Sequence, residues 1–263
     1  MLNLFLLGYP KILINEEPVS NFVTNKAEAL FYYLAVTKRT HGRSHLANLF
    51  WPDVSEQTAR KNLRDVLSNL RQLLGQHLII LREEVTFNSA EPYWLDVDAY
   101  RSLIKAPTAG RSSALQQALT LYQNEFLTGF HVRNAIPFEE WQLFQREELA
   151  MVAGQGMHRL IDLYIQEEAY EAGLALTYRL LEAEPWDEKA YRKQMLLFML
   201  NGQRGAALRQ YEVCHRILAR ELGVPPLPET VDLYQQIRTG NISKAIEIQH
   251  IGKYHTQERF QAN

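Results

Sequence analysis

The stretch SEQTARKNLRDVLSNLRQLL, residues 55–74, decides how this sequence is interpreted. Its apolar residues recur at spacings of three and four, which place them on one side of a helix at about 100° per residue. This predicted core face consists of Ala59, Leu63, Val66, Leu70 and Leu73. Gly75 follows where a glycine commonly ends a helix. The spacing therefore predicts one long amphipathic helix over residues 55–74.

A second set of side chains falls on another side of the same helix. It consists of Gln57, Arg60, Lys61, Arg64, Ser68 and Arg71. These positions span roughly 100° of the helical wheel and include four cations but no acid. Glu56 and Asp65 lie outside the stripe. Because solvated helix faces usually mix charges of both signs, this face is predicted to meet negative charge.

The flanking sequence places this helix in a small α+β domain. Two β-rich segments, residues 2–8 and 11–15, come first, followed by predicted helices at 26–36 and 43–50. After the long helix, residues 77–81 and 85–88 predict a β-hairpin around the turn Arg82-Glu83-Glu84, and Tyr93–Val97 could add a final strand. An N-terminal sheet, three helices and a hairpin predict a winged helix over residues 1–97.

From Asp98 onward the pattern is helical almost throughout, which predicts an all-α second domain over residues 98–240. The expected helices are 98–105, 112–123, 138–166, 170–183, 187–201, 204–220 and 228–238. Two helix-pair starts, at residues 169–172 and 203–206, lie 34 residues apart, which is the period of tetratricopeptide repeats. Residues 241–263 lack a strong pattern and are expected to be a tail or a linker.

Charge distribution says more about partners than net charge, which is only −2. Residues 38–82 contain eight basic and three acidic residues. A basic stripe on a nearly neutral protein indicates phosphate contact, although a merely solvated helix would look similar. No run of 18 apolar residues is present, so no membrane span is expected. The apolar N-terminus is interpreted as a strand and not as a signal peptide. The single cysteine, Cys214, cannot form an intramolecular disulfide, which fits an intracellular, cytoplasmic setting.

A positively charged helix of this kind can enter the major groove of double-stranded DNA. Arg64 and Lys61, which are central and in its N-terminal half, are expected near base edges, whereas Arg60 and Arg71 are expected on phosphates. Candidate contacts elsewhere lie at the start of the second helix, which crosses the DNA backbone in helix-turn-helix docking, and at the hairpin tip. The whole candidate set is Arg39, Arg43, Gln57, Arg60, Lys61, Arg64, Ser68, Arg71 and Arg82.

No constellation in the sequence supports catalysis, so an enzyme is not expected. The histidines His131, His158 and His215 lack partners at metal-ligand spacing, and the phosphate-loop pattern GxxxxGK[ST] does not occur. Cys214 lies in a helical pattern beside apolar residues and is read as a small core residue. No catalytic residue, cofactor or metal is therefore predicted.

Several motifs resemble those of the Streptomyces antibiotic regulatory protein family. They are Leu49-Phe50-Trp51-Pro52-Asp53, Ala59-Arg60-Lys61-Asn62-Leu63-Arg64 and Leu67-Ser68-Asn69-Leu70-Arg71, with Trp94-Leu95-Asp96-Val97. The second half resembles the bacterial transcriptional activator domain, through Leu121-Tyr122, Glu125-Phe126-Leu127, Glu140-Trp141, residues 207–212 and residues 221–230. The resemblance covers about residues 1–240.

The resemblance implies a winged helix of the response-regulator effector type joined to a tetratricopeptide-like helical domain. It also implies activation of transcription from direct DNA repeats near promoters and contact with RNA polymerase, and it allows a homodimer on the DNA. Two features depart from the pattern: Gly42 stands where many members have a serine-type helix cap, and Glu83-Glu84 in the wing would repel phosphate. The alternative is a helical scaffold whose winged helix contacts proteins rather than DNA.

Overall fold

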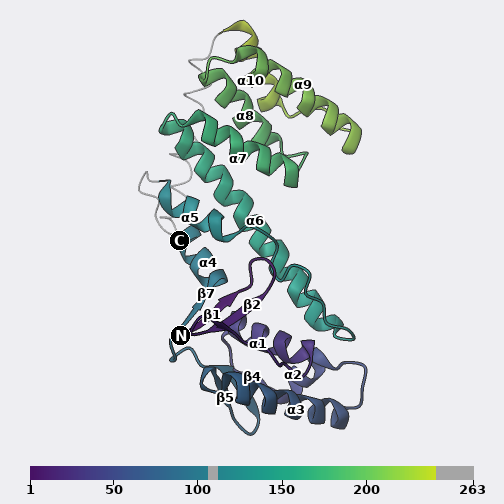
Figure 1. Ribbon diagram of the computed structural model, residues 1–263. Helices are drawn as coiled ribbons and strands as arrows, with labels where there is room; N and C mark the ends of the chain where they lie inside the picture. Colours follow the sequence, from purple (N-terminus) through teal and green to yellow (C-terminus); the bar gives the residue numbers. More distant parts are fainter. Residues whose placement is uncertain (106–111, 241–263) are drawn as a thin grey trace, which may run out of the picture. The chain divides into compact units, whose positions relative to one another are not determined.

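The computed structural model describes residues 1–105 and 112–240, and it forms two compact units. The first unit ends at Ala153 and the second begins at Gly154, with Ser112 belonging to the second. Helices predominate, and the strands gather in small sheets near the N-terminus (Figure 1). Among the described residues, no helix combines the length and the apolar character that crossing a bilayer requires.

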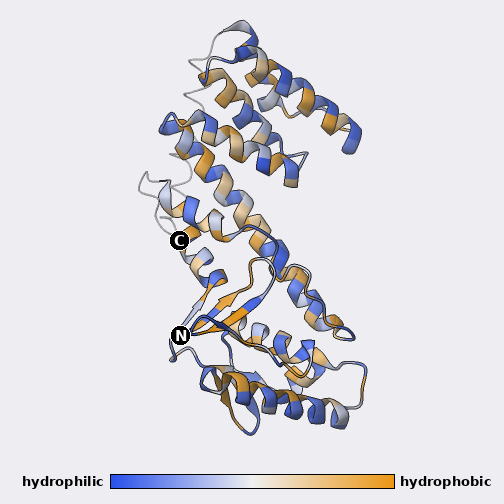
Figure 2. Cartoon of the chain, in the orientation of Figure 1, coloured by the Kyte–Doolittle hydropathy of each residue, from blue (hydrophilic) through white to orange (hydrophobic). Residues whose placement is uncertain are grey.

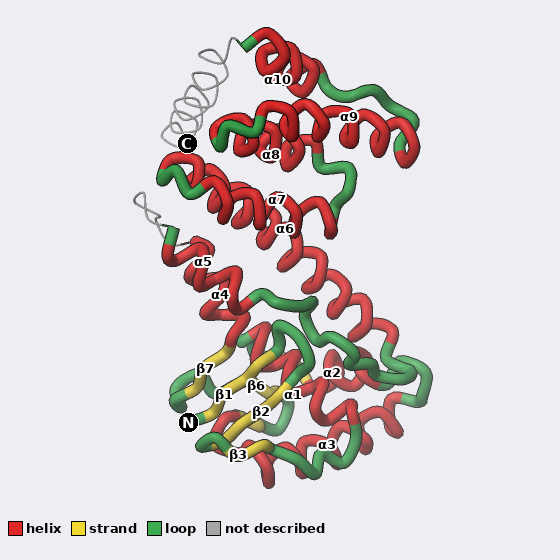
Figure 3. The backbone as a smooth tube through the Cα atoms, turned by 45° about the horizontal axis from the view of Figure 1, so that its top comes forward, coloured by secondary structure: helices red, strands yellow, loops and turns green. Residues whose placement is uncertain are grey.

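The first sheet contains four strands, which Figure 3 shows side by side. Their order is β3 (Glu17–Pro18), β2 (Lys11–Ile14), β1 (Leu2–Phe5) and β7 (Tyr93–Leu95). β1 pairs antiparallel with β2 and parallel with β7, so that Leu4 lies opposite Ile12 on one side and Leu95 on the other. The additional strand suggested at 93–97 is therefore present, but it ends at Leu95 because helix α4 (Asp96–Lys105) begins at the next residue.

Three helices lie in the sequence between β3 and β7 of this sheet. They are α1 (Asn25–Thr37), α2 (Arg43–Phe50) and α3 (Glu56–Leu74). Thr24 caps α1 by accepting a hydrogen bond from the backbone N–H of Ala27, whereas Gly42, the N-cap of α2, offers no side-chain acceptor. Gly75 does not end α3 in the left-handed conformation typical of a glycine cap, and the chain continues into the 3-10 turn η1 (Gly75–His77).

The second sheet contains the predicted hairpin and one short additional strand. Its order is β4 (His41–Gly42), β6 (Glu84–Phe87) and β5 (Leu78–Ile80). β5 and β6 pair antiparallel, with Ile79 opposite Thr86. β4 directly precedes α2 and pairs with β6, so the hairpin is hydrogen-bonded to the chain that leads into the second helix.

The first unit extends well beyond the residue at which the sequence pattern changes. It also contains α4, α5 (Ser113–Leu121) and the beginning of α6 (Ile136–Gln166). The backbone of Leu127 donates a hydrogen bond to the carbonyl of Leu6, which joins this segment to the chain after β1. Trp141 packs edge-on against Tyr33 of α1, with ring centroids 4.9 Å apart and an interplanar angle of 71°. The compact unit therefore includes residues on both sides of the expected boundary at 97.

The second unit is entirely helical over its described residues. After the end of α6 it contains α7 (Tyr170–Ala183), α8 (Glu188–Leu200), α9 (Arg204–Glu221) and α10 (Pro228–Thr239). Asp187 caps α8 and also contacts Nε2 of His158 at 2.8 Å. Cys214 is fully buried, as predicted for a core residue, and burial raises the pKa of its thiol to about 12. The predicted tail at 241–263 lies outside the described residues.

Candidate nucleic-acid interface

Helix α3 has the boundaries and the amphipathic character that its sequence predicts. Ser55 accepts a hydrogen bond from the backbone N–H of Thr58 and so begins the helix. The buried face is Ala59, Leu63, Val66, Leu67, Leu70 and Leu74. Leu67 and Leu74 are thus buried, whereas Leu73, predicted in the core, is only half-buried. In Figure 2 apolar and polar residues alternate along this helix, as two distinct faces require.

Every member of the predicted polar stripe is exposed on α3. The exposed side chains are Gln57, Arg60, Lys61, Arg64, Ser68 and Arg71. Asn69, next to the stripe, already has partners within the protein. Its side chain accepts from the backbone N–H of Val23 and donates to the carbonyl of Asn21. That pair of bonds holds the segment before α1 against α3. The stripe itself remains open to a partner.

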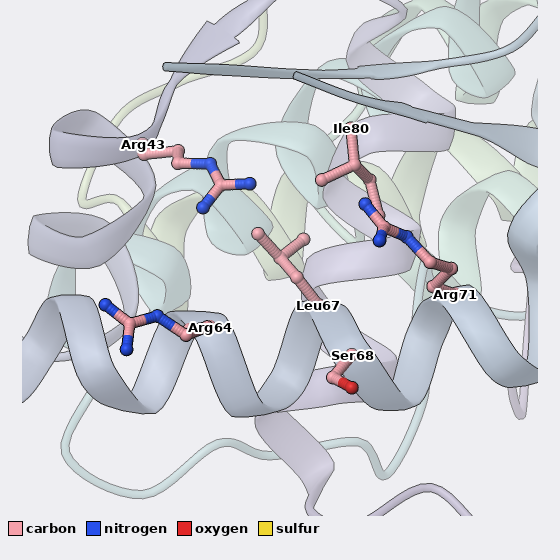
Figure 4. A pocket seen from close by; sticks show the side chains of 6 residues that line it. All are labelled: Arg43, Arg64, Leu67, Ser68, Arg71 and Ile80. Atoms are coloured by element: carbon pink, nitrogen blue, oxygen red, sulfur yellow. The ribbon is translucent and has the colours of Figure 1, made fainter. Parts of the chain in front are cut away.

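Three arginines meet around one hollow beside α3 (Figure 4). The hollow has a volume of about 210 Å³ and is lined by Arg43, Arg64, Leu67, Ser68, Arg71 and Ile80. In Figure 4, Arg43 extends from α2 above α3, and the guanidinium of Arg71 rises beside Ile80. No carboxylate lines the hollow. Positive charge without a counter-charge makes this place suited to an anion.

Arg43 is held at this hollow by its own backbone. It is the first residue of α2, and its N–H donates to the carbonyl of Glu83 in the hairpin at 2.9 Å. Its side-chain Nε is enclosed and finds no hydrogen-bond acceptor within the described parts of the chain. The guanidinium of Arg43 therefore lines the hollow without a bond from its Nε to any described residue.

Arg60 differs from the other cations of the stripe because it has protein partners. It forms an ion pair with Glu56, one turn earlier, at 2.7 Å, and its Nη2 donates to Oγ of Ser44 at 2.8 Å. The stripe itself contains no acid, but Glu56 beside it pairs with one of its members. The pair is weak because both side chains are more than half exposed, at 53% and 67%.

The two remaining candidates lie apart from the hollow. Arg82 stands at the hairpin tip with its side chain 96% exposed, and its contact with Glu83 is long at 3.6 Å. Arg39 lines a different hollow, together with residues of α4 and α6. The structure therefore groups Arg43 with Arg64, Ser68 and Arg71, and it does not bring Arg39 or Arg82 into that group.

Three residues of this surface were not predicted from the sequence. Ser44 orients Arg60, while Leu67 and Ile80 form the apolar floor and wall of the hollow. Ser44 could have been suspected because hydroxyl groups near a helix start commonly contact phosphates or neighbouring side chains. Ile80 carries no such signal, since its position depends on how the hairpin packs against α3.

A cationic helix beside a β-hairpin, followed by helical hairpins, defines a bacterial transcription regulator of the Streptomyces antibiotic regulatory protein type. Residues 95–238 match the family model described as the bacterial transcriptional activator domain, and the chain belongs to this family. The resemblance drawn from the sequence motifs is thereby confirmed. The matched residues include part of the first compact unit as well as the described second unit.

Two curated relatives are similar to most of the chain. "Regulatory protein AfsR" of Streptomyces griseus is 26% identical over 211 residues, and that of Streptomyces coelicolor is 27% identical over 213 residues. Each alignment covers 76% of this chain but 20% of the relative, so the chain spans about a fifth of the length of the proteins it matches.

A solved structure shares the fold. It is titled "Mycobacterium tuberculosis EmbR in complex with low affinity phosphopeptide" and is 21% identical, with a TM-score of 0.73. The alignment covers 98% of this chain and 71% of that one. At this identity the likeness concerns the fold alone.

Proposed function

We propose that this protein is a sequence-specific DNA-binding activator of transcription whose first 97 residues act as a winged helix. Helix α3 enters the major groove, which accommodates one α-helix with its side chains against the base edges. The observation that carries the proposal is the hollow of Arg43, Arg64 and Arg71, which has cations on two helices and no acid in its lining. Membership of a family of transcription regulators supports the same conclusion.

The positions of the side chains suggest a division of roles. Lys61 and Arg64, exposed in the first half of α3, would lie near base edges, where arginine can pair with both acceptors of a guanine. Arg43, Ser68 and Arg71 would surround a phosphate at the hollow. Arg60 and Gln57 would contact the backbone nearer the start of α3, and Arg82 would reach the DNA from the hairpin tip.

The hairpin is the weaker part of this interface. Arg82 is followed by Glu83 and Glu84, both exposed, and these carboxylates would repel DNA phosphates. Specificity should therefore rest mainly on α3.

Contact with RNA polymerase, binding to direct repeats near promoters and dimerisation on DNA rest on the family resemblance. Two copies on a direct repeat would place their half-sites about one helical turn, or 10–10.5 bp, apart. The tetratricopeptide-like helices α7–α10 would then be available for protein contacts. The alternative function is a protein scaffold in which the winged helix contacts protein.

The test is DNA selection from genomic fragments, followed by footprinting of the enriched sites. A specific complex whose affinity falls steeply with salt is expected. Arg64→Ala should then weaken the specific complex by about 1–3 kcal/mol and relax the preference at one base pair. Arg133→Ala is the matched control, because Arg133 is exposed in the first unit but lies outside the hollow and outside α3.

Two outcomes would contradict the proposal. If the selection enriched no particular DNA sequence, the scaffold function would be favoured. An unchanged footprint in the Arg64 variant would show that α3 does not read the bases.

A further inference from the structure

A second hollow in the first unit combines exposed aromatic surface with unpaired positive charge. Its volume is about 510 Å³, within the range of about 300–1,000 Å³ common for ligand sites. It is lined by Val36, Thr37, Arg39, Arg101, Lys105, Trp141, Phe144, Gln145 and Glu148, from the end of α1 and from α4 and α6. None of these residues belongs to the DNA-facing hollow beside α3.

The apolar part of this hollow has one fixed wall and one open wall. Trp141 is fixed, because it packs against Phe126 and Phe138 with centroids 5.8 and 5.4 Å away. Phe144, one turn further along α6, is 63% exposed, and none of the described aromatic rings packs against it. A phenylalanine left in water beside a rigid tryptophan is typical of a surface that a partner covers.

The charged part of the hollow is predominantly cationic. Arg101 donates to Glu148 at 2.7 Å and to Gln145 at 3.1 Å, so its charge is already paired. Arg39 and Lys105 form no ion pair with any residue that the structure describes. Three cations thus face a single carboxylate, and the excess charge favours an anionic occupant.

We propose that this hollow binds an acidic segment of a partner protein, with a large apolar side chain of that segment inserted between Trp141 and Phe144. The carboxylates of the segment would pair with Arg39 and Lys105. A macromolecular occupant is favoured over a small molecule because a second exposed apolar side chain, Met151 at 58%, lies about two turns along α6 from Phe144 on the same side of the helix, beyond Glu147 and Glu148. Aromatic and arginine side chains are also those that contribute most energy at protein interfaces.

The test begins with selection of binding peptides from a random displayed library against the intact chain. A parallel counter-selection against Phe144→Ala removes peptides that bind elsewhere. The consensus is expected to contain aspartate or glutamate on either side of a phenylalanine, tryptophan or leucine. One consensus peptide is then synthesised with a fluorophore for anisotropy titrations.

Variants with matched controls separate this hollow from the rest of the surface. Phe144→Ala, Arg39→Glu and Lys105→Glu should each weaken peptide binding by about tenfold or more, which corresponds to about 1.4 kcal/mol. The controls are Leu143→Ala and Arg133→Glu, since Leu143 is 54% exposed on α6 but does not line the hollow. The controls should leave peptide affinity within about twofold. Phe144→Ala should leave DNA affinity unchanged, so this inference can fail without the proposed function failing.

Three results would overturn the inference. One is a selection that yields no peptide dependent on Phe144. Another is a consensus that is basic or neutral. The third is equal binding of a peptide whose apolar residue is replaced by serine, because the hollow would then be a simple anion site.

Discussion

The Nη2 atom of Arg60 donates to the Oγ atom of Ser44 at 2.8 Å and so links the surface of α3 to the first turn of α2. Glu56 pairs with the same Nη2 atom at 2.7 Å. The arginine is therefore already oriented, which lowers the entropy lost when it contacts DNA. Preorganisation comes with a cost, since the Glu56 carboxylate stands next to the place where phosphates would lie.

Glu56→Gln is expected to strengthen DNA binding. Removal of the carboxylate takes away a repulsion with phosphate worth about 0.5–1 kcal/mol, a few-fold in affinity at low salt. Protein stability should change by less than about 0.5 kcal/mol, because the ion pair with Arg60 is exposed. Anisotropy titrations over a range of salt concentrations measure the effect, with Glu139→Gln on α6 as the control. Weaker binding by the Glu56 variant would show instead that orientation of Arg60 matters more than repulsion.

Gly173→Ala is expected to destabilise the second unit, whereas Gly154→Ala should stabilise the protein. A Cβ atom at Gly173 would lie 2.8 Å from Cδ2 of the buried Leu197, so that side chain or the helices α7 and α8 would have to shift, at a cost of about 1–3 kcal/mol. At Gly154, within α6, the Cβ would meet nothing within 4 Å, and alanine gains about 0.5–1 kcal/mol of helix propensity. Urea unfolding of both variants tests the pair. Equal effects of the two substitutions would contradict the close packing at Gly173.

Asp96 should make stability fall as pH rises through the acidic range. Burial raises the pKa of this carboxyl from 3.8 to about 6, although hydrogen bonds from the N–H groups of Leu6, Leu7 and Val97 oppose the shift. Below pH 3.8 the group is protonated in both states, and its full stabilisation is present. Between pH 3.8 and about 6 only the folded state holds the proton, so the free energy of unfolding falls by up to about 1.4 kcal/mol per pH unit.

The measurement compares wild type with Asp96→Asn by urea unfolding at several pH values in that interval. The variant should be less stable at every pH, because the amide cannot accept all the hydrogen bonds, but it should lack this contribution to the slope. The difference between the two proteins isolates the group from other carboxylates. If the free energy of unfolding changed with pH in the same way in both proteins, the raised pKa of Asp96 would be refuted.

Local periodicity predicted the helices closely. The observed bounds of α2 and α7 are the predicted ones, and the other helices differ at their ends by at most two residues. The exchange of Leu73 for Leu67 in the core of α3 has a simple cause. Helical spacing places both leucines at the margins of the apolar side, and the packing of the neighbouring elements against α3 decides which of them is covered.

Contacts between distant parts of the chain could not be predicted in this way. Arg39 and Arg43 are four residues apart and were both placed near the start of the second helix. β4, which pairs with β6, lies between them, and they line different hollows. Asp96 is similar, since its partners Leu6 and Leu7 lie about 90 residues earlier. No local pattern encodes such a pairing.

The position of β1 has a consequence for how the N-terminal part can be isolated. β1 is an inner strand, and one of its neighbours, β7, is formed by residues 93–95. The chain just after β1 is in turn paired with Leu127 and Thr128. A fragment cut at residue 97 would keep β7 but lose those later partners, and one cut before 93 would also bare an edge of β1. Exposed strand edges invite pairing between molecules. During synthesis, the backbone just after β1 must therefore wait for more than a hundred later residues before its hydrogen-bond partners at Leu127 and Thr128 exist.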